Sequence, residues 1–457
     1  MCPKPASAAA SPLRSAPAEP VSLENLAACI EDARVAALEG DDGPPDPADF
    51  ESLRARLEEA RLELPPLYRR ATGDPFIRKL DRLGAKGFAN VLGQDPELEG
   101  AARLLFDIAQ AVLQNGEGYE KRATHAFQEV VSDLYDGFLS AEDRRGVKPP
   151  DRGVVPPLGK WGSAESGPYT WPVTATSTFD VEAAVVSLPA ANARRGLLAW
   201  SALAHETAGH DLLAADDGLH DELARVVRER LMAGKVGLAV ADYWADRLDE
   251  TASDVLGVLN MGPAAAVGLI GYFRALNGVY TGKAVLRNAG GEEDPHPADL
   301  ARGYLGAETV RLLSFGAAGK WADRLVVETD RDLGQIRLGR TAVTVAVAKA
   351  SAAIVARTIV REKLASLERH AFGEIQDWRD ADEAIVSALR EDLRAGRRAE
   401  TRYVAGTYAA HVVAAAVTEA VGARTDVRRV MDRMVRVLAA MHDANPAWVP
   451  VKVPPAR

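Results

Sequence analysis

The chain has 457 residues, of which 47% are hydrophobic and 26% are charged, so it is long enough to form two or three globular domains. Its net charge of −10 argues against non-specific nucleic-acid binding, which needs a basic surface. The only cysteines, Cys2 and Cys29, cannot form a disulfide framework or a cysteine-rich zinc site. Any transition metal would therefore have to be bound by histidine and carboxylate side chains.

The first part of the chain predicts a leader followed by helices. Residues 1–22 are rich in proline, alanine and serine, which is typical of a flexible leader and not of a secretory signal. Residues 23–145 carry apolar residues at helical spacing and predict an N-terminal helical domain. Its expected helices cover 23–40, 50–64, 98–115 and 119–139, and the second should end at Pro65 and Pro66.

The composition changes at residue 146, where a proline- and glycine-rich stretch marks a boundary. The segment 174–189 is rich in threonine, valine and phenylalanine and is the best strand candidate. Helical patterns resume at Arg194 and continue to about residue 445, before a proline-rich tail that we expect to be irregular. We therefore predict a mostly α (α+β) fold, in which a region over 146–305 holds the small β element and a C-terminal helical domain covers 306–457.

The longest apolar stretch, residues 403–421, predicts a buried helix. It is interrupted by His411 and Glu419 and is rich in alanine, unlike a membrane-spanning segment. With few cysteines and no recognisable export signal, we expect a cytoplasmic location and no membrane partner.

One short motif points to metal chemistry. Residues 205–210 read HETAGH, in which two histidines lie five positions apart. In the familiar H-E-x-x-H zinc motif the spacing is four, which places both histidines on one helix face. With a spacing of five, their side chains would lie about 140° apart on a regular helix. A one-residue bulge at Gly209 would bring His205 and His210 together, and Glu206 would then be the general base.

A later segment supplies candidate carboxylates. Glu250 and Asp254 are four residues apart and should share a helix face next to a strongly apolar sequence. Carboxylates beside a buried segment need partners, and a metal site would provide them. Glu250 could be the third ligand, and Asp254 could accept a hydrogen bond from a ligating imidazole.

These two motifs together resemble dipeptidyl peptidase III, a zinc metallopeptidase with a helix-rich catalytic half, whose HExxGH motif is followed by an E-E-x-x-A-E/D segment. The likeness covers about fifty residues, and Asp249 and Ser253 depart from the second motif. It implies a zincin-like metallopeptidase core over 146–305, flanked by helical domains. It also implies one Zn²⁺ per chain, bound by His205, His210 and Glu250, with Glu206 activating the water.

Other residues are candidates for supporting roles. His296 lies in a loop between two prolines and could donate a hydrogen bond to the oxyanion of the transition state. His220 could be a fourth ligand, although a turn followed by a new helix explains its segment equally well. In zincins the strand before the metal-binding helix pairs with an extended substrate, and residues 182–189 are the candidate for that role.

The sequence thus predicts a zinc-dependent hydrolase, specifically a metallopeptidase acting on a peptide or small protein. Two alternatives stay open. The same residues could serve a metal-dependent enzyme of non-peptide chemistry, or the chain could be a helical scaffold or binding protein whose metal is structural. The oligomeric state cannot be inferred from the sequence.

Overall fold

The computed structural model describes residues 21–448 apart from 41–42, 48, 141–142, 145, 153–154, 209, 397–406 and 423–424. The predicted leader therefore lies almost wholly outside the described residues, as does the predicted irregular tail. Gly209, the predicted site of the helical bulge, also lies outside them.

The prediction of a mostly helical chain is confirmed. The first half contains α1 Leu26–Leu38, α2 Phe50–Glu63, α3 Pro66–Tyr68, α4 Asp74–Gln94, α5 Ala101–Glu117, α6 Lys121–Leu139, α7 Val173–Thr176, α8 Leu197–Ala208 and α9 Leu219–Ala233. The second half contains α10 Leu238–Ala245, α11 Leu248–Met261, α12 Pro263–Tyr280, α13 Asp299–Arg311, α14 Ala318–Asp330, α15 Val345–Arg361, α16 Phe372–Ile375, α17 Asp380–Ala395, α18 Ala409–Gly422 and α19 Val427–Ala444. Among the described helices, none combines the length and apolar composition needed to cross a bilayer.

Local sequence signals explain where several helices begin and end. Helix α2 begins after Asp49, whose side chain accepts a hydrogen bond from the Ser52 amide, and it ends just before Pro65. Helix α5 ends at Gly118, which adopts the left-handed conformation common after helix C-termini. Helix α19 begins after Asp426, which accepts from two amides of the first turn.

Two small sheets interrupt the helices. The first has the order β1-β3-β2, with β1 Leu158–Gly162 parallel and β2 Tyr169–Trp171 antiparallel to the central strand β3 Val185–Pro189. The second contains β4 Ala289–Gly290, β5 Ile336–Leu338 and β6 Thr341–Val343. The expected strand over 174–189 is therefore correct only in its second half, because residues 173–179 form short helical turns.

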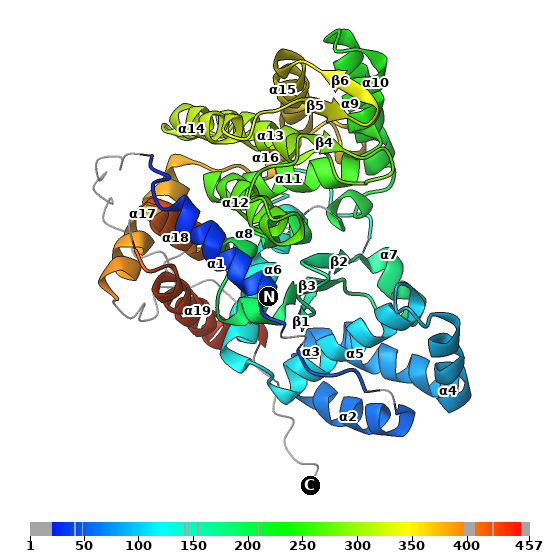
Figure 1. The fold of residues 1–457 in the computed structure, drawn as a ribbon. Helices are drawn as coiled ribbons and strands as arrows, with labels where there is room; N and C mark the ends of the chain where they lie inside the picture. Colours follow the sequence, from blue (N-terminus) through cyan, green and yellow to red (C-terminus); the bar gives the residue numbers. More distant parts are fainter. Residues whose placement is uncertain are drawn as a thin grey trace.

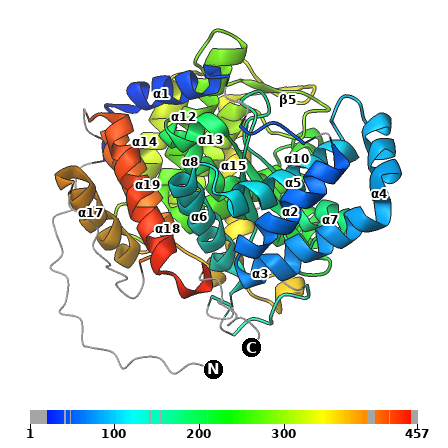
Figure 2. The same ribbon diagram turned by 90° about the horizontal axis from the view of Figure 1, so that it is seen from below.

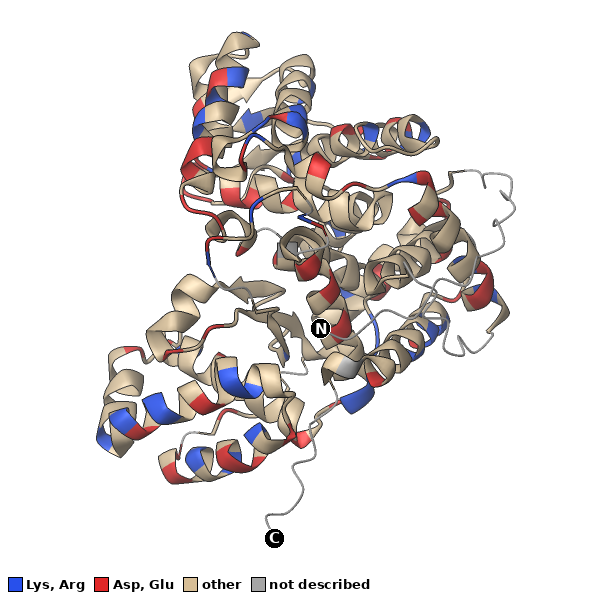
Figure 3. Ribbon diagram, turned by 180° about the vertical axis from the view of Figure 1, so that it is seen from behind, with Lys and Arg blue, Asp and Glu red and all other residues tan. Residues whose placement is uncertain are grey.

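The first sheet lies between two hydrophobic cores. Side chains alternate across a strand, so Val186 and Leu188 of β3 join the main core while Val185 joins a second core. The second core is built from α2, α4 and α5, which with α7 form the lower right part of Figure 1. On α2 and its neighbours, basic and acidic residues are interspersed (Figure 3) and form ion pairs such as Arg54 with Asp81.

The outer edge of β1 is covered by amide side chains. Gln114 donates to the Trp161 carbonyl at 2.9 Å and accepts from the Trp161 amide at 2.7 Å. Gln128 accepts from the Gly159 amide, and Asn115 donates to the Gly159 carbonyl. These side chains take the place of a strand beside β1. Strand β2 forms the opposite edge of the sheet, and no described strand pairs with its outer side.

Helix α8 lies at the centre of the main core and packs against α1, α6, α11, α12 and α18. Figure 2 shows α6 and α8 between α18 and α19 on one side and α2 and α5 on the other. Segments near the beginning and the end of the described chain also meet. Asn25 donates to the carbonyls of Ala420 and Thr425, near the end of α18. Both cores combine segments from either side of the boundary at residues 145 and 146, and the domain boundaries stay a prediction.

Candidate metal centre

Helix α8 carries the first two site residues into the protein interior. Its sequence LLAWSALAHETA is apolar up to His205, so the helix is enclosed on several sides and buries His205 and Glu206 with it. The helix ends at Ala208, and His210 follows in a turn. His210 lies beside His205, and their ring centroids are 5.6 Å apart.

Helix α11 supplies the carboxylates. Glu250 and Asp254 lie one turn apart, and both are buried. The two helices cross closely beside the site, because a Cβ atom at Gly257 would lie only 3.0 Å from the backbone of Ala204. Glycine at this position thus allows α11 to approach α8 and brings Glu250 to the histidines.

The three predicted ligands come together. Glu250 Oε2 lies 3.2 Å from His205 Nε2, and Glu250 Oε1 lies 3.8 Å from His210 Nε2. One ligand atom from each of the three residues lies within 4.8 Å of the others. Glu250 Oε2 is buried and, although His205 Nε2 lies 3.2 Å away, it forms no well-aligned hydrogen bond with a described residue. Two imidazole nitrogens and one carboxylate oxygen are a donor set that fits zinc.

Asp254 contacts His205 on the ring edge opposite Glu250. Its Oδ1 lies 2.9 Å from His205 Nδ1, which places the Nδ1 proton toward Asp254 and leaves Nε2 facing Glu250. Arg302 of α13 binds both oxygens of Asp254, at 2.7 and 2.8 Å, and its guanidinium lies 3.7 Å from Glu250. Arg302 and Asp254 are almost completely buried.

The electrostatics of this cluster favour a cation. Burial opposes protonation of His205, but its contacts with Asp254 and Glu250 outweigh burial and raise its pKa to about 10. Burial likewise opposes ionisation of Glu250, yet contacts with His205, Arg302 and His296 lower its pKa well below the usual range. Without metal, protonated His205 and Arg302 therefore balance the charges of Glu250 and Asp254. A divalent ion would take the place of the His205 proton.

Glu206 is held by the edge strand. Thr170 of β2 donates to the Glu206 carboxylate at 2.9 Å and contacts its backbone carbonyl at 3.0 Å. A second link lies nearby, where the Val173 amide donates to Asp211, the residue after His210. Strand β2 and the residues just after it are thus linked to Glu206 and Asp211, on either side of the candidate ligand His210. The expected substrate strand over 182–189 is wrong in this respect, because β3 is central and both of its edges are paired.

His296 reaches the site from the loop before α13. Its Nε2 lies 3.5 Å from Glu250 Oε1, its Nδ1 lies 2.9 Å from Asp294, and its side chain is 46% exposed. It lies beside the ligand group without joining it. His220, a candidate for a fourth ligand, does not join the ligand group. Its Nε2 lies 3.5 Å from Asp249 Oδ1.

Sequence reasoning did not identify Arg302 and Thr170. A basic residue within the apolar helix sequence ADLARGYLGA is a signal that could have indicated Arg302, because a buried cation needs an anionic partner. Thr170 lies in the proline- and glycine-rich stretch, and its sequence carries no comparable signal.

Compared with protein-family models, with curated proteins and with solved structures, the chain matches none of them. The resemblance to dipeptidyl peptidase III therefore depends on the two motifs alone.

Proposed function

We propose that the chain is a zinc-dependent hydrolase, and specifically a metallopeptidase. The observation that carries this proposal is the meeting of His205, His210 and Glu250, whose ligand atoms lie within 4.8 Å of one another. A structural zinc site is usually closed by four protein ligands, whereas three ligands leave a position for water. The partial exposure of His210 and His296 supports an open, catalytic site.

Each residue has a role in this proposal. Zinc bound by the three ligands supplies Lewis-acid polarisation and a water of lowered pKa. Glu206 takes the proton of that water and passes it to the leaving amine, while Thr170 fixes the orientation of the Glu206 carboxylate. His296, held through Nδ1 by Asp294, donates from Nε2 to the developing oxyanion when its ring is protonated.

The substrate binds along β2. This strand is half-buried, lies at the end of the sheet and contacts Glu206 through Thr170. An extended peptide can add to such an edge by backbone hydrogen bonds, which places its scissile bond next to the general base. Peptides and small unfolded proteins are therefore the substrate class that we propose.

The test combines metal analysis with a peptide library. We expect His210→Ala to lose one equivalent of zinc relative to the wild type, because only two ligands remain. Glu206→Gln should keep that zinc but lower peptide hydrolysis by about 10²- to 10⁴-fold, since it removes the general base. Circular dichroism of each variant checks that the fold is kept.

Other outcomes separate the alternatives. Equal zinc in the wild type and His210→Ala would overturn the site. Zinc that is lost in His210→Ala, together with no hydrolysis of any peptide by the wild type, would favour non-peptide chemistry or a structural metal. A structural metal would further show itself as a loss of stability on chelation.

A further inference from the structure

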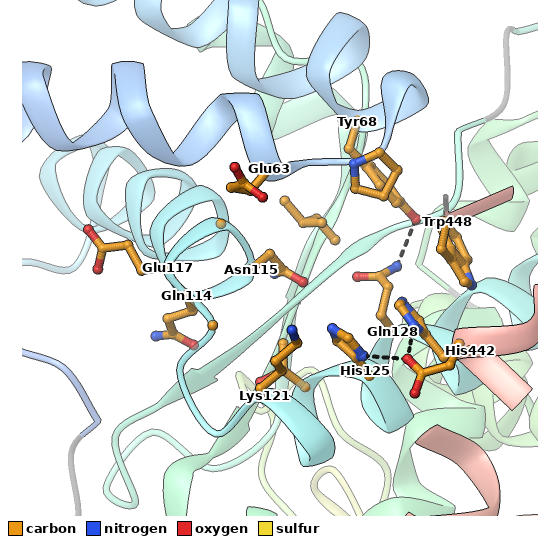
Figure 4. Close-up of a pocket in the computed structure, with 16 residues that line it drawn as sticks. Glu63, Tyr68, Gln114, Asn115, Glu117, Lys121, His125, Gln128, His442 and Trp448 are labelled. Atoms are coloured by element: carbon orange, nitrogen blue, oxygen red, sulfur yellow. Dashed lines mark hydrogen bonds and ion pairs between the residues drawn. The ribbon is translucent and has the colours of Figure 1, made fainter. Parts of the chain in front are cut away.

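A second group of histidine and carboxylate side chains lies apart from the candidate metal centre at His205. Residues of α5, α6 and α19 line a cavity of about 420 Å³, together with Tyr68 of α3 and Trp448 (Figure 4). Trp448 belongs to a 3-10 helix over Pro446–Trp448. The cavity contains His125 of α6 and the neighbouring pair His442 and Asp443 at the end of α19.

These three side chains converge. One ligand atom from each lies within 4.8 Å of the others. Asp443 Oδ1 lies 3.1 Å from His125 Nδ1 and 3.7 Å from His442 Nδ1. His442 Nδ1 is buried and has no hydrogen-bond partner among the described residues. A buried ring nitrogen without a partner, next to a carboxylate, is an incomplete arrangement.

The ring of His442 is held in place by two neighbouring rings. Its ring stacks between His125, at 4.1 Å, and Trp448, at 5.5 Å. Trp448 is itself fixed, because its indole Nε1 donates to Glu129 at 2.6 Å. Glu129 lies one turn after His125 on α6, so a single face of this helix presents both a candidate ligand and the anchor of the supporting tryptophan.

We propose that His125, His442 and Asp443 form a second site for a divalent transition-metal ion, separate from the centre at His205. Two imidazoles and one carboxylate suit zinc, nickel, cobalt or copper, and the remaining coordination positions face the cavity. The ring planes of His125 and His442 lie 24° apart with their centroids 4.1 Å apart, so binding of one ion by both rings requires one ring to turn. His125 is the ring that turns, since its side chain is 27% exposed and that of His442 only 11%. The bound ion then joins the end of α19 to α6.

The experiment counts zinc ions. Metal-free protein is titrated with zinc at micromolar concentrations, and bound metal is measured by elemental analysis after gel filtration. We expect two equivalents in the wild type, one in His125→Ala, one in His210→Ala and none in the double variant. Asp443→Asn should lose the same equivalent as His125→Ala, and His370→Ala, outside both groups, should keep two.

His125→Ala is preferred to a substitution at His442. The His125 side chain is less buried, so its removal should disturb folding less. Circular dichroism confirms the fold of each variant. The proposal is overturned if the wild type binds one equivalent that only His210→Ala loses, or if His125→Ala and Asp443→Asn bind as much zinc as the wild type. An equivalent that depends on His125 but not on His210 would support this site even if the proposed peptidase centre failed.

Discussion

Arg302 helps to keep the buried carboxylates of the His205 centre ionised, and for Asp254 it is the strongest favourable partner. Its guanidinium binds Asp254 through two hydrogen bonds and lies close to Glu250, and both members of the pair are almost fully buried. Removing one partner of a buried ion pair leaves an unpaired charge. We therefore expect Arg302→Met to lower the free energy of unfolding of the metal-free protein by about 3–5 kcal/mol, measured by urea denaturation.

A surface pair provides the control for this substitution. Arg340 pairs with Glu292, but the Arg340 side chain is 83% exposed. Arg340→Met should therefore change the free energy of unfolding by about 1 kcal/mol or less. Equal changes in the free energy of unfolding would show that the buried Arg302–Asp254 pair stabilises the fold no more than a surface pair does.

The candidate metal ligands were easier to predict than the residues that contact them. The spacing within HETAGH and within the Glu250 segment indicated which side chains could meet, and the structure brings them together. Such motifs follow from chemistry that is local in sequence. Arg302 and Thr170 act across long sequence separations, through α13 and β2, and their positions depend on packing that no short pattern encodes.

At the scale of elements, amide side chains take the place of a strand beside β1, and their contribution to stability can be tested. Gln114 pairs with both the amide and the carbonyl of Trp161 and is almost fully buried. Gln114→Leu would leave both backbone groups without partners in the interior. We expect it to lower the free energy of unfolding by about 1–3 kcal/mol for each unpaired group.

Gln94→Leu is the matched control, because Gln94 is exposed at the end of α4. It should change the free energy of unfolding by about 0.5 kcal/mol or less. If thermal or urea denaturation gave the same stability for both variants, the amide contacts of Gln114 would not stabilise β1.

No expected segment covered α4 Asp74–Gln94, but the other long N-terminal helices were predicted because they are periodic. The expected segments 50–64 and 119–139 nearly coincide with α2 and α6. Short elements are a different case, since β2 and β4 to β6 have only two or three residues each and too few positions to show alternation. The threonine-rich half of 174–189 turns away from the sheet at Asp180, which adopts a left-handed conformation.

At the scale of the whole molecule, Asp133 links pH to stability. It lies on α6, accepts a hydrogen bond from the Ala410 amide at the start of α18, and burial together with acidic neighbours raises its pKa to about 8. The folded protein thus binds this proton more tightly than the unfolded chain, whose ordinary pKa is near 3.8. Its contribution to stability is complete below pH 3.8 and is lost as the pH rises toward 8.

Asp133→Asn should remove this dependence while keeping an acceptor for Ala410. We expect the variant to be more stable than the wild type at pH 8 and the difference to be smaller at pH 5. Urea denaturation at both pH values measures it, and parallel pH profiles of the two proteins would contradict the assignment.

The packing of α8 has a consequence for biosynthesis. The helix that carries His205 and Glu206 is enclosed by α1 and α6 from the beginning of the chain and by α18 from near its end, and Asn25 is bonded to the last turn of α18. A ribosome releases these segments in order, several hundred residues apart. The first helix must therefore wait for nearly the whole chain to emerge before its contacts with α18 can form. The second core, built mainly from α2 to α5, has no such delay and can assemble first. In a nascent chain arrested before α18, this second core should consequently be protected from protease while helix α8 is still cleaved.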